Sequence, residues 1–216
     1  MHLRRETVPR KWPVSRKGTK YVIRPNSNLR KGIPILVFIR DMLKVAQNRK
    51  EVKKAIHTKD ILINGKSARN EKDAVLLFDK VTLVPSKKNY KLNLAENGKY
   101  TAEEINDSEA KSKVSRVNDK KILRGKKTQL NLSDGRNYLT DLKCGVNDSV
   151  VIDFATRKIS KCLPLKEKAR VIVFAGKHTG KRGEIVKMMP ERKMVSLIAG
   201  KDTINVLIKQ IMVTEK

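Results

Sequence analysis

The chain has 216 residues, with 50 Lys and Arg against 22 Asp and Glu, so its formal net charge is +28. A polyanion can neutralise such an excess, and because aromatic residues make up only 4%, we expect contacts to phosphate rather than extensive stacking on bases. The length and the 39% hydrophobic content allow one to three small domains, but hardly one large enzyme core with a deep cleft.

The sequence also argues against a membrane-spanning or secreted protein. No segment approaches the roughly 20 apolar residues that cross a bilayer, and no apolar region of a secretory signal follows the basic residues 1–12. Cys144 and Cys162 lie far apart and neither belongs to a CxxC pair. We therefore expect no disulfide framework, no zinc site, no cofactor and a reducing cytoplasmic setting.

Residues 1–32 contain ten Lys and Arg and the single acid Glu6. This charge, with three prolines, predicts an extended segment with little regular structure that nucleic acid would order, and Trp12, Tyr21 and Ile23 could fix it by apolar contacts. Its expected nucleic-acid contacts are Arg10, Lys11, Arg16, Lys17, Lys20, Arg24, Arg30 and Lys31.

Residues 33–46 predict a first short helix. Pro34 suits a first helical turn, and apolar side chains then recur at helical spacing. These side chains are Leu36, Ile39, Leu43 and Ala46. Arg40 and Lys44 are the nucleic-acid contacts that we expect from this segment.

Residues 49–57 predict a second helix with two distinct faces. At 100° per residue, Val52, Ala55 and Ile56 share one arc, so this face would pack against the protein. The opposite face would present positive charge to a polyanion. It consists of Arg49, Lys50, Lys53, Lys54 and His57.

Two Asn-Gly pairs predict β-hairpins, because both residues of such a turn tolerate positive φ. The first turn, Asn64-Gly65, follows the apolar residues 61–63 and returns over residues 66–69, with a further strand at 81–84. Expected contacts here are Asn64, Lys66 and Arg69.

The second turn, Asn97-Gly98, would join residues 90–94 to 99–101. Beyond it, Thr101 and Glu104 form a capping box, which predicts a short polar helix carrying Glu103 and Glu104.

The rest of the chain predicts short strands. Residues 128–132 alternate and end in the turn 133–136, and residues 150–154 predict a buried strand. Further strands are predicted at 170–175, 184–188, 194–198 and 203–208. Such a run is typical of a small barrel.

A glycine-rich basic loop connects the first two of these last strands. Gly176, Gly180 and Gly183 permit sharp turns and close backbone approach. A nucleotide-binding P-loop is excluded, because only three residues separate the first two glycines and no Ser or Thr follows Lys181. The expected contacts of the loop are Lys177, His178, Lys181 and Arg182.

The sequence offers no catalytic arrangement. The histidines His2, His57 and His178 lie in cationic surroundings without a neighbouring carboxylate or cysteine to form a proton relay.

Two regions resemble known RNA-binding modules. The two helices followed by residues 59–66 resemble the S-four module, and residues 171–186 resemble the KOW motif. The order of these motifs along the chain is similar to one family, small-subunit ribosomal protein four of the archaeal and eukaryotic (e) type. The short length and the sequence of residues 125–132 favour the archaeal members. The matching stretches are Lys11-Trp12 and residues 33–43, 51–54, 63–66, 125–137 and 176–183.

The resemblance implies an α+β protein in four parts. These are a basic extended N-terminal segment (1–32), a small α+β S-four-type RNA-binding module (33–96), a β-rich central domain (97–165) and an SH3-like KOW barrel (166–216). It further implies a non-enzymatic constituent of the small ribosomal subunit that binds folded ribosomal RNA beside neighbouring ribosomal proteins. Two alternatives are an RNA-modifying enzyme with an S-four appendage, which needs a separate catalytic domain, and a KOW-bearing transcription elongation factor.

Overall fold

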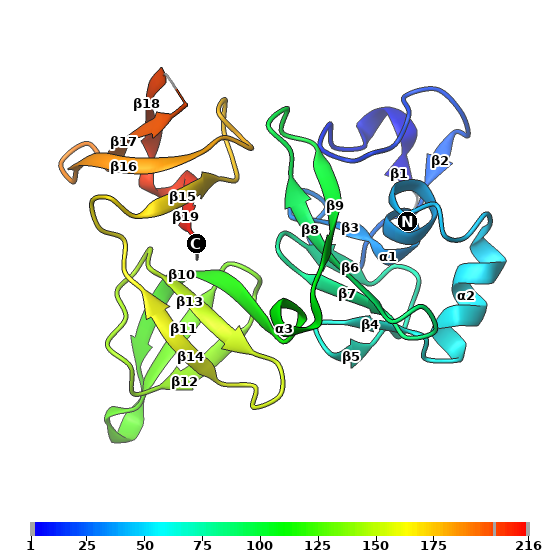
Figure 1. Ribbon diagram of the computed structural model, residues 1–216, viewed down its shortest axis with the longest axis horizontal. Helices are drawn as coiled ribbons and strands as arrows, with labels where there is room; N and C mark the ends of the chain where they lie inside the picture. Colours follow the sequence, from blue (N-terminus) through cyan, green and yellow to red (C-terminus); the bar gives the residue numbers. More distant parts are fainter. Residues whose placement is uncertain (1–2, 201, 215–216) are drawn as a thin grey trace. The chain divides into compact units, whose positions relative to one another are not determined.

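The computed structural model describes residues 3–200 and 202–214, which form mostly β structure in two compact units (Figure 1). Unit 1 comprises residues 1–95 and 99–111, and unit 2 comprises residues 96–98 and 112–216. In the described part of the chain, no helix is long and apolar enough to cross a membrane.

The basic N-terminal segment of unit 1 is looped, so the prediction of an extended segment is wrong for its described part (Figure 1). β1 (Leu3–Arg4) pairs antiparallel with β2 (Tyr21–Val22), and η1 (Arg5–Thr7) follows β1 directly. Trp12 is buried as expected, whereas the Tyr21 residue is 46% exposed. The main chain supplies another tie, because the Tyr100 amide donates to the Lys11 carbonyl at 2.8 Å.

The first helical segment is shorter than predicted. It follows β3 (Gly32–Pro34) and consists of α1 (Ile35–Val37) and the π-helical turn η2 (Phe38–Met42). Pro34 precedes the helix as its cap residue, and Ala46 lies beyond its end. Lys44 adopts a φ of 56°, a left-handed conformation that ends the helix.

The second helix, α2 (Arg49–His57), has the predicted bounds. Its N-terminus is closed by Asn48, whose side chain accepts a hydrogen bond from the Glu51 amide, while Glu51 accepts one from the Gln47 amide at 2.7 Å. This reciprocal arrangement satisfies amide groups that a helix start leaves without partners.

The remaining strands of unit 1 confirm both Asn-Gly hairpins. They are β4 (Ile61–Ile63), β5 (Lys66–Ser67), β6 (Ala74–Leu76), β7 (Lys80–Leu83), β8 (Lys88–Leu94) and β9 (Tyr100–Ile105). One sheet has the order β5-β4-β7-β8-β9, and β3 pairs separately with β6. In the first turn, Asn64 and Gly65 have φ values of 51° and 74°, as a type I′ turn requires.

The polar helix predicted from the capping box is wrong. Residues 101–105 belong to β9, which pairs with β8 from Tyr100 opposite Leu94 to Ile105 opposite Asn89. Cross-strand contacts replace the cap: Asn93 donates to Glu103 at 2.7 Å. A helix begins only at α3 (Asp107–Ala110).

Unit 2 contains two antiparallel five-stranded sheets. The first has the order β12-β11-β10-β13-β14. Its strands are β10 (Ser112–Ile122), β11 (Thr128–Leu132), β12 (Asn137–Thr140), β13 (Ser149–Asp153) and β14 (Ile159–Leu163), with η3 (Arg124–Lys126) between β10 and β11. Its core includes Val117, Leu130 and Val150, all fully buried.

The second sheet confirms the four strands predicted near the end of the chain and adds one. Its strands are β15 (Arg170–Val173), β16 (Arg182–Met189), β17 (Met194–Ala199), β18 (Asp202–Leu207) and β19 (Ile211–Val213), with η4 (Ile208–Gln210) before β19. The order is β18-β17-β16-β15-β19 around a separate core that includes Val171, Ile185 and Leu197.

Candidate nucleic-acid interface

Helix α2 has one packed and one cationic face. Val52 and Ile56 are buried. Lys50, Lys53 and Lys54 are exposed, as is His57. The three lysine side chains face solvent, and Lys53 also helps to lower the pKa of the nearby Glu71 carboxyl.

Arg49 differs from its neighbours on this face. Its Nε donates to Glu71 Oε2 at 2.7 Å, and its Nη2 donates to the other carboxylate oxygen. The Arg49 hydrogen bond lowers the pKa of the buried Glu71 carboxyl against the opposing effect of desolvation. Arg49 therefore ties the start of α2 to the β5–β6 connection, and part of its charge is already compensated.

The Asn64 side chain supports the β4–β5 turn instead of extending from it. Asn64 is 4% exposed; its Nδ2 donates to Asp79 Oδ1 at 2.8 Å, and its Oδ1 accepts from the Lys80 amide at 3.0 Å. With both amide atoms used internally, the expectation of a nucleic-acid contact is corrected to a structural role. Lys66 and Arg69 are exposed beside the turn.

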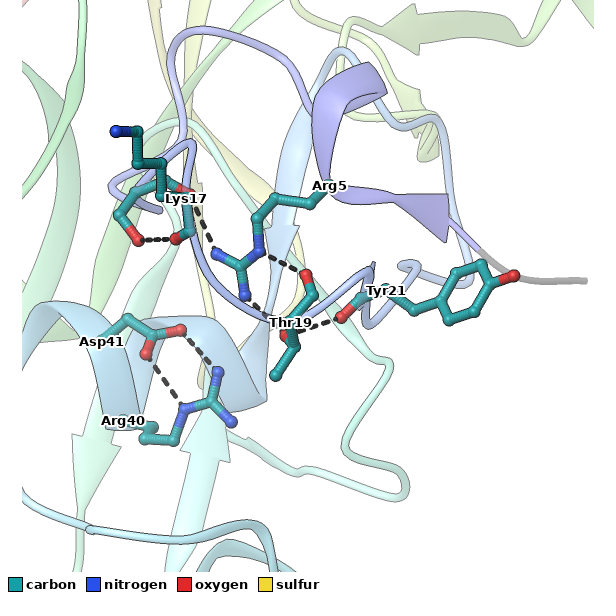
Figure 2. Close-up of polar contacts among 7 residues, drawn as sticks. Arg5, Lys17, Thr19, Tyr21, Arg40 and Asp41 are labelled. Atoms are coloured by element: carbon teal, nitrogen blue, oxygen red, sulfur yellow. Dashed lines mark hydrogen bonds and ion pairs between the residues drawn. The ribbon is translucent and has the colours of Figure 1, made fainter.

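Arg5, which the sequence did not single out, organises the N-terminal loop (Figure 2). Its guanidinium donates to the Thr19 carbonyl at 2.6 Å, the Ser15 carbonyl at 2.9 Å and the Thr19 hydroxyl at 2.7 Å. These bonds close residues 15–19 around the Arg5 side chain. Nothing in the pattern distinguished Arg5 from the neighbouring cations, because its role depends on where the loop returns.

The predicted cations of the N-terminal segment lie in the irregular stretches between η1 and β3, outside β2. Arg16, Lys17 and Lys20 are exposed, and Arg16 donates to the Glu6 carbonyl at 3.0 Å. Lys11 is half-buried, and burial lowers the pKa of its ammonium group. The other exposed cations are Arg10, Arg24, Arg30 and Lys31.

Arg40 makes a two-bond ion pair with Asp41 (Figure 2). Its Nε and Nη2 donate to the two carboxylate oxygens at 3.0 and 2.9 Å, and these hydrogen bonds raise the pKa of Arg40. Its charge is therefore largely compensated within the protein. Lys44, at the helix end, is exposed.

The glycine-rich loop of unit 2 has the sharp backbone that its sequence predicted. Gly176 and Gly180 have φ values of 90° and 95°, and the Thr179 hydroxyl donates to the Gly176 carbonyl at 2.6 Å. A Cβ at Gly183 would overlap the main-chain carbonyl of Ile198 on the adjacent strand. The loop displays exposed Lys177 and Arg182 and half-buried His178 and Lys181.

Most of the predicted cations thus lie on three segments of the structure, and Arg40, Lys44, Lys66 and Arg69 lie elsewhere in unit 1. The N-terminal loop and the α2 face lie in unit 1, and the glycine-rich loop lies in unit 2. Among the residues described, no cluster of His, Cys, Asp or Glu could hold a metal ion. His2 lies outside these residues.

Comparisons with known proteins agree with the sequence resemblance. The model of ribosomal family S4e matches residues 86–159. The small ribosomal subunit protein eS4 of Methanocella arvoryzae is 34% identical over 187 residues, which cover 85% of this chain and 79% of that protein. The eS4 protein of Nanoarchaeum equitans is 34% identical over 208 residues, covering 92% of this chain and 89% of its own length.

A solved structure supports the fold. The crystal structure of 30S ribosomal protein S4e from Thermoplasma acidophilum matches with a TM-score of 0.73 at 22% identity. The match covers 85% of this chain and 94% of that one.

Proposed function

The chain belongs to the S4e family of small-subunit ribosomal proteins, and we propose that it binds and stabilises folded ribosomal RNA through several separate basic surfaces. The family consists of structural ribosomal components, so the protein is not an enzyme. Its proposed partners are small-subunit ribosomal RNA and neighbouring ribosomal proteins. Its proposed location is the ribosome in the cytoplasm, where it supports translation.

The observation that carries the RNA-binding proposal is the cationic face of α2. Lys50, Lys53 and Lys54 stand on one side of a helix whose other side packs against the protein. Salt bridges within unit 1 compensate other cations, such as Arg40, but leave these three available. Lysines in this arrangement favour contacts to phosphate, which position a protein on RNA without reading bases.

The Lys and Arg displayed on the N-terminal loop and the glycine-rich loop supply the other proposed contacts. The three surfaces lie on different elements. This distribution suits a protein that joins several parts of a folded RNA. It also favours a ribosomal role over that of a transcription elongation factor.

We assign the S-four-type module to residues 33–96, the central domain to residues 97–165 and the KOW-type barrel to residues 166–216. The two helical segments followed by the β4–β5 turn support the first assignment. The two sheets of unit 2, each with its own core, support the other two. Within the assigned central domain, residues 99–111 pack with unit 1, because β9 pairs with β8.

Sedimentation of cell extract tests the function directly. The protein is expected in the small-subunit fraction at low salt, and it should leave that fraction together with ribosomal RNA after ribonuclease treatment. Co-sedimentation with RNA polymerase, or absence from ribosomal particles, would contradict the proposal.

A further inference from the structure

The hairpin that joins β10 to β11 extends beyond the core of its sheet (Figure 1). Ile122 pairs with Thr128, and the Leu123 amide donates to the Lys127 carbonyl at 2.8 Å, which closes the tip over residues 124–126. Gly125 at the tip has a φ of 77°, and a Cβ placed there would meet no atom within 4 Å. The tip therefore projects into solvent.

Large apolar side chains are exposed on this projecting hairpin. Ile122 is 77% exposed and Leu123 is 40% exposed. On the neighbouring strand β12, Leu139 is 60% exposed; it pairs with Gln129, which pairs in turn with Lys121. Lys121, Gln129 and Leu139 thus form one row on one face of the sheet, and Ile122, Thr128 and Thr140 form the next row on the opposite face. Large apolar side chains that a projecting hairpin exposes indicate a surface that is covered by a partner.

The charged residues of the hairpin tip itself, residues 121–127, are all positive. Lys121, Arg124 and Lys127 are exposed, and none of the three has a hydrogen bond or ion pair through its side chain to another described residue. Lys120, by contrast, donates to the Cys144 carbonyl at 3.3 Å and turns back toward the sheet. No Asp or Glu occurs between residues 120 and 133.

We propose that this hairpin tip, defined by Lys121, Ile122, Leu123, Arg124 and Lys127, enters the minor groove of an RNA helix. The inference rests on the proposed RNA-binding function and adds a fourth contact surface to it. The A-form minor groove is wide and shallow, and it displays ribose edges between two rows of phosphates. Ile122 and Leu123 pack against riboses, while the cations contact the phosphates on either side.

The two kinds of contact have different salt dependences, which gives the proposal a sharp test. The full-length chain is titrated with transcribed small-subunit ribosomal RNA over a range of salt concentrations. The triple variant Lys121→Gln, Arg124→Gln, Lys127→Gln should make the negative slope of log affinity against log salt shallower by about two to three units. The double variant Ile122→Ser, Leu123→Ser should weaken binding roughly tenfold and leave the slope unchanged.

A variant with the same loss of charge elsewhere in unit 2 serves as the matched control. Lys158, Lys161 and Lys166 are all exposed and lie outside the hairpin tip. Their replacement by Gln lowers the net charge equally but should retain the hydroxyl-radical protection of one RNA helix, which both hairpin variants lose. Because the substituted side chains are exposed, circular dichroism should show every variant folded.

Three outcomes separate this inference from the function on which it rests. Failure of the unaltered protein to bind ribosomal RNA would overturn both. Hairpin variants that bind with unchanged affinity, slope and footprint would overturn the minor-groove contact alone. If these variants bind RNA normally but fail to enter small subunits, the tip contacts a protein instead, and the proposal is wrong.

Discussion

The guanidinium of Arg116 on β10 donates a 2.6 Å hydrogen bond to the main-chain carbonyl of Lys209, 93 residues further along the chain. Arg116 is buried beside the Phe174 ring, with its charge centre 5.5 Å from the ring centroid. Burial lowers the pKa of Arg116. A second link joins the two sheets of unit 2, because the Val213 amide donates to the Ser149 hydroxyl at 3.0 Å.

Arg116→Met should lower the free energy of unfolding of unit 2 by about 2–3 kcal/mol, because the main-chain carbonyls of Ile208 and Lys209 lose a charged donor. The loss is measured by guanidinium chloride denaturation of the full-length chain, with hydrogen exchange of the backbone amides in unit 2 as the probe. Ser149→Ala, which removes the second link, is expected to cost about 1–2 kcal/mol. A fully stable Arg116→Met protein would show that the hydrogen bond to Lys209 does not hold the sheets together.

Asn64→Ala should destabilise unit 1 by about 2–3 kcal/mol. The substitution leaves the buried Asp79 carboxylate and the Lys80 amide each without one hydrogen bond. It also replaces asparagine at positive φ by alanine, which tolerates that conformation less well. Thermal unfolding measures the change, with Lys66→Ala on the exposed side of the same turn as the control. Equal stability of both variants would restore Asn64 as a candidate RNA contact.

Tyr100 predicts a pH dependence at the alkaline end. Burial raises the pKa of its hydroxyl to about 12, whereas the unfolded chain has a value near 10. Below pH 10 the group is protonated in both states and contributes no pH dependence. Between pH 10 and 12 only the unfolded state loses the proton, so about 2–3 kcal/mol of stability should be lost as pH rises.

Urea denaturation of unaltered protein and Tyr100→Phe at a series of pH values isolates this contribution. The difference in unfolding free energy between the two proteins should shift in favour of the Phe variant above pH 10. A constant difference from pH 8 to 12 would contradict the assignment.

Gly183→Ala should disrupt the pairing of β16 with β17, because the added methyl group overlaps the Ile198 carbonyl. We expect a loss of about 1–3 kcal/mol in the stability of the second sheet. Gly135→Ala is the informative comparison: its φ of 84° is unfavourable for alanine, but a Cβ there meets nothing within 4 Å. If Gly183→Ala is the less destabilised of the two variants, the close approach of the Ile198 carbonyl is not what requires glycine at position 183.

Local sequence patterns correctly predicted the elements whose conformation is determined by a few neighbouring residues. Helix α2 has its cap and both faces within ten residues, and each Asn-Gly pair encodes its own hairpin turn. Strand β10 was not predicted, because its polar half, residues 118–122, resembles a loop until β11 pairs with it. The same limitation explains the false helix at Thr101, whose conformation is determined by pairing with β8.

The candidate sites divide in the same way. Net charge and helical periodicity identified Lys50, Lys53 and Lys54 as candidate RNA contacts. Their proposed role depends only on exposure to solvent, which helical periodicity predicts. The structural roles of Arg5 and Asn64 depend on carbonyls and carboxylates that folding brings close. No spacing in the sequence distinguishes such residues from the cations and turn residues that remain exposed.

The salt dependence of RNA binding by the α2 face tests the central claim most directly. Affinity for small-subunit ribosomal RNA is measured against salt for unaltered protein, for Lys53→Gln, Lys54→Gln and for the control Lys158→Gln, Lys161→Gln. The account predicts that the α2 variant makes the negative slope of log affinity against log salt shallower by about two units. Substantial binding should remain through the other surfaces, with the footprint lost at one RNA site only. An unchanged slope with an intact footprint would contradict α2 as an RNA face, and complete loss of binding would contradict the distributed interface.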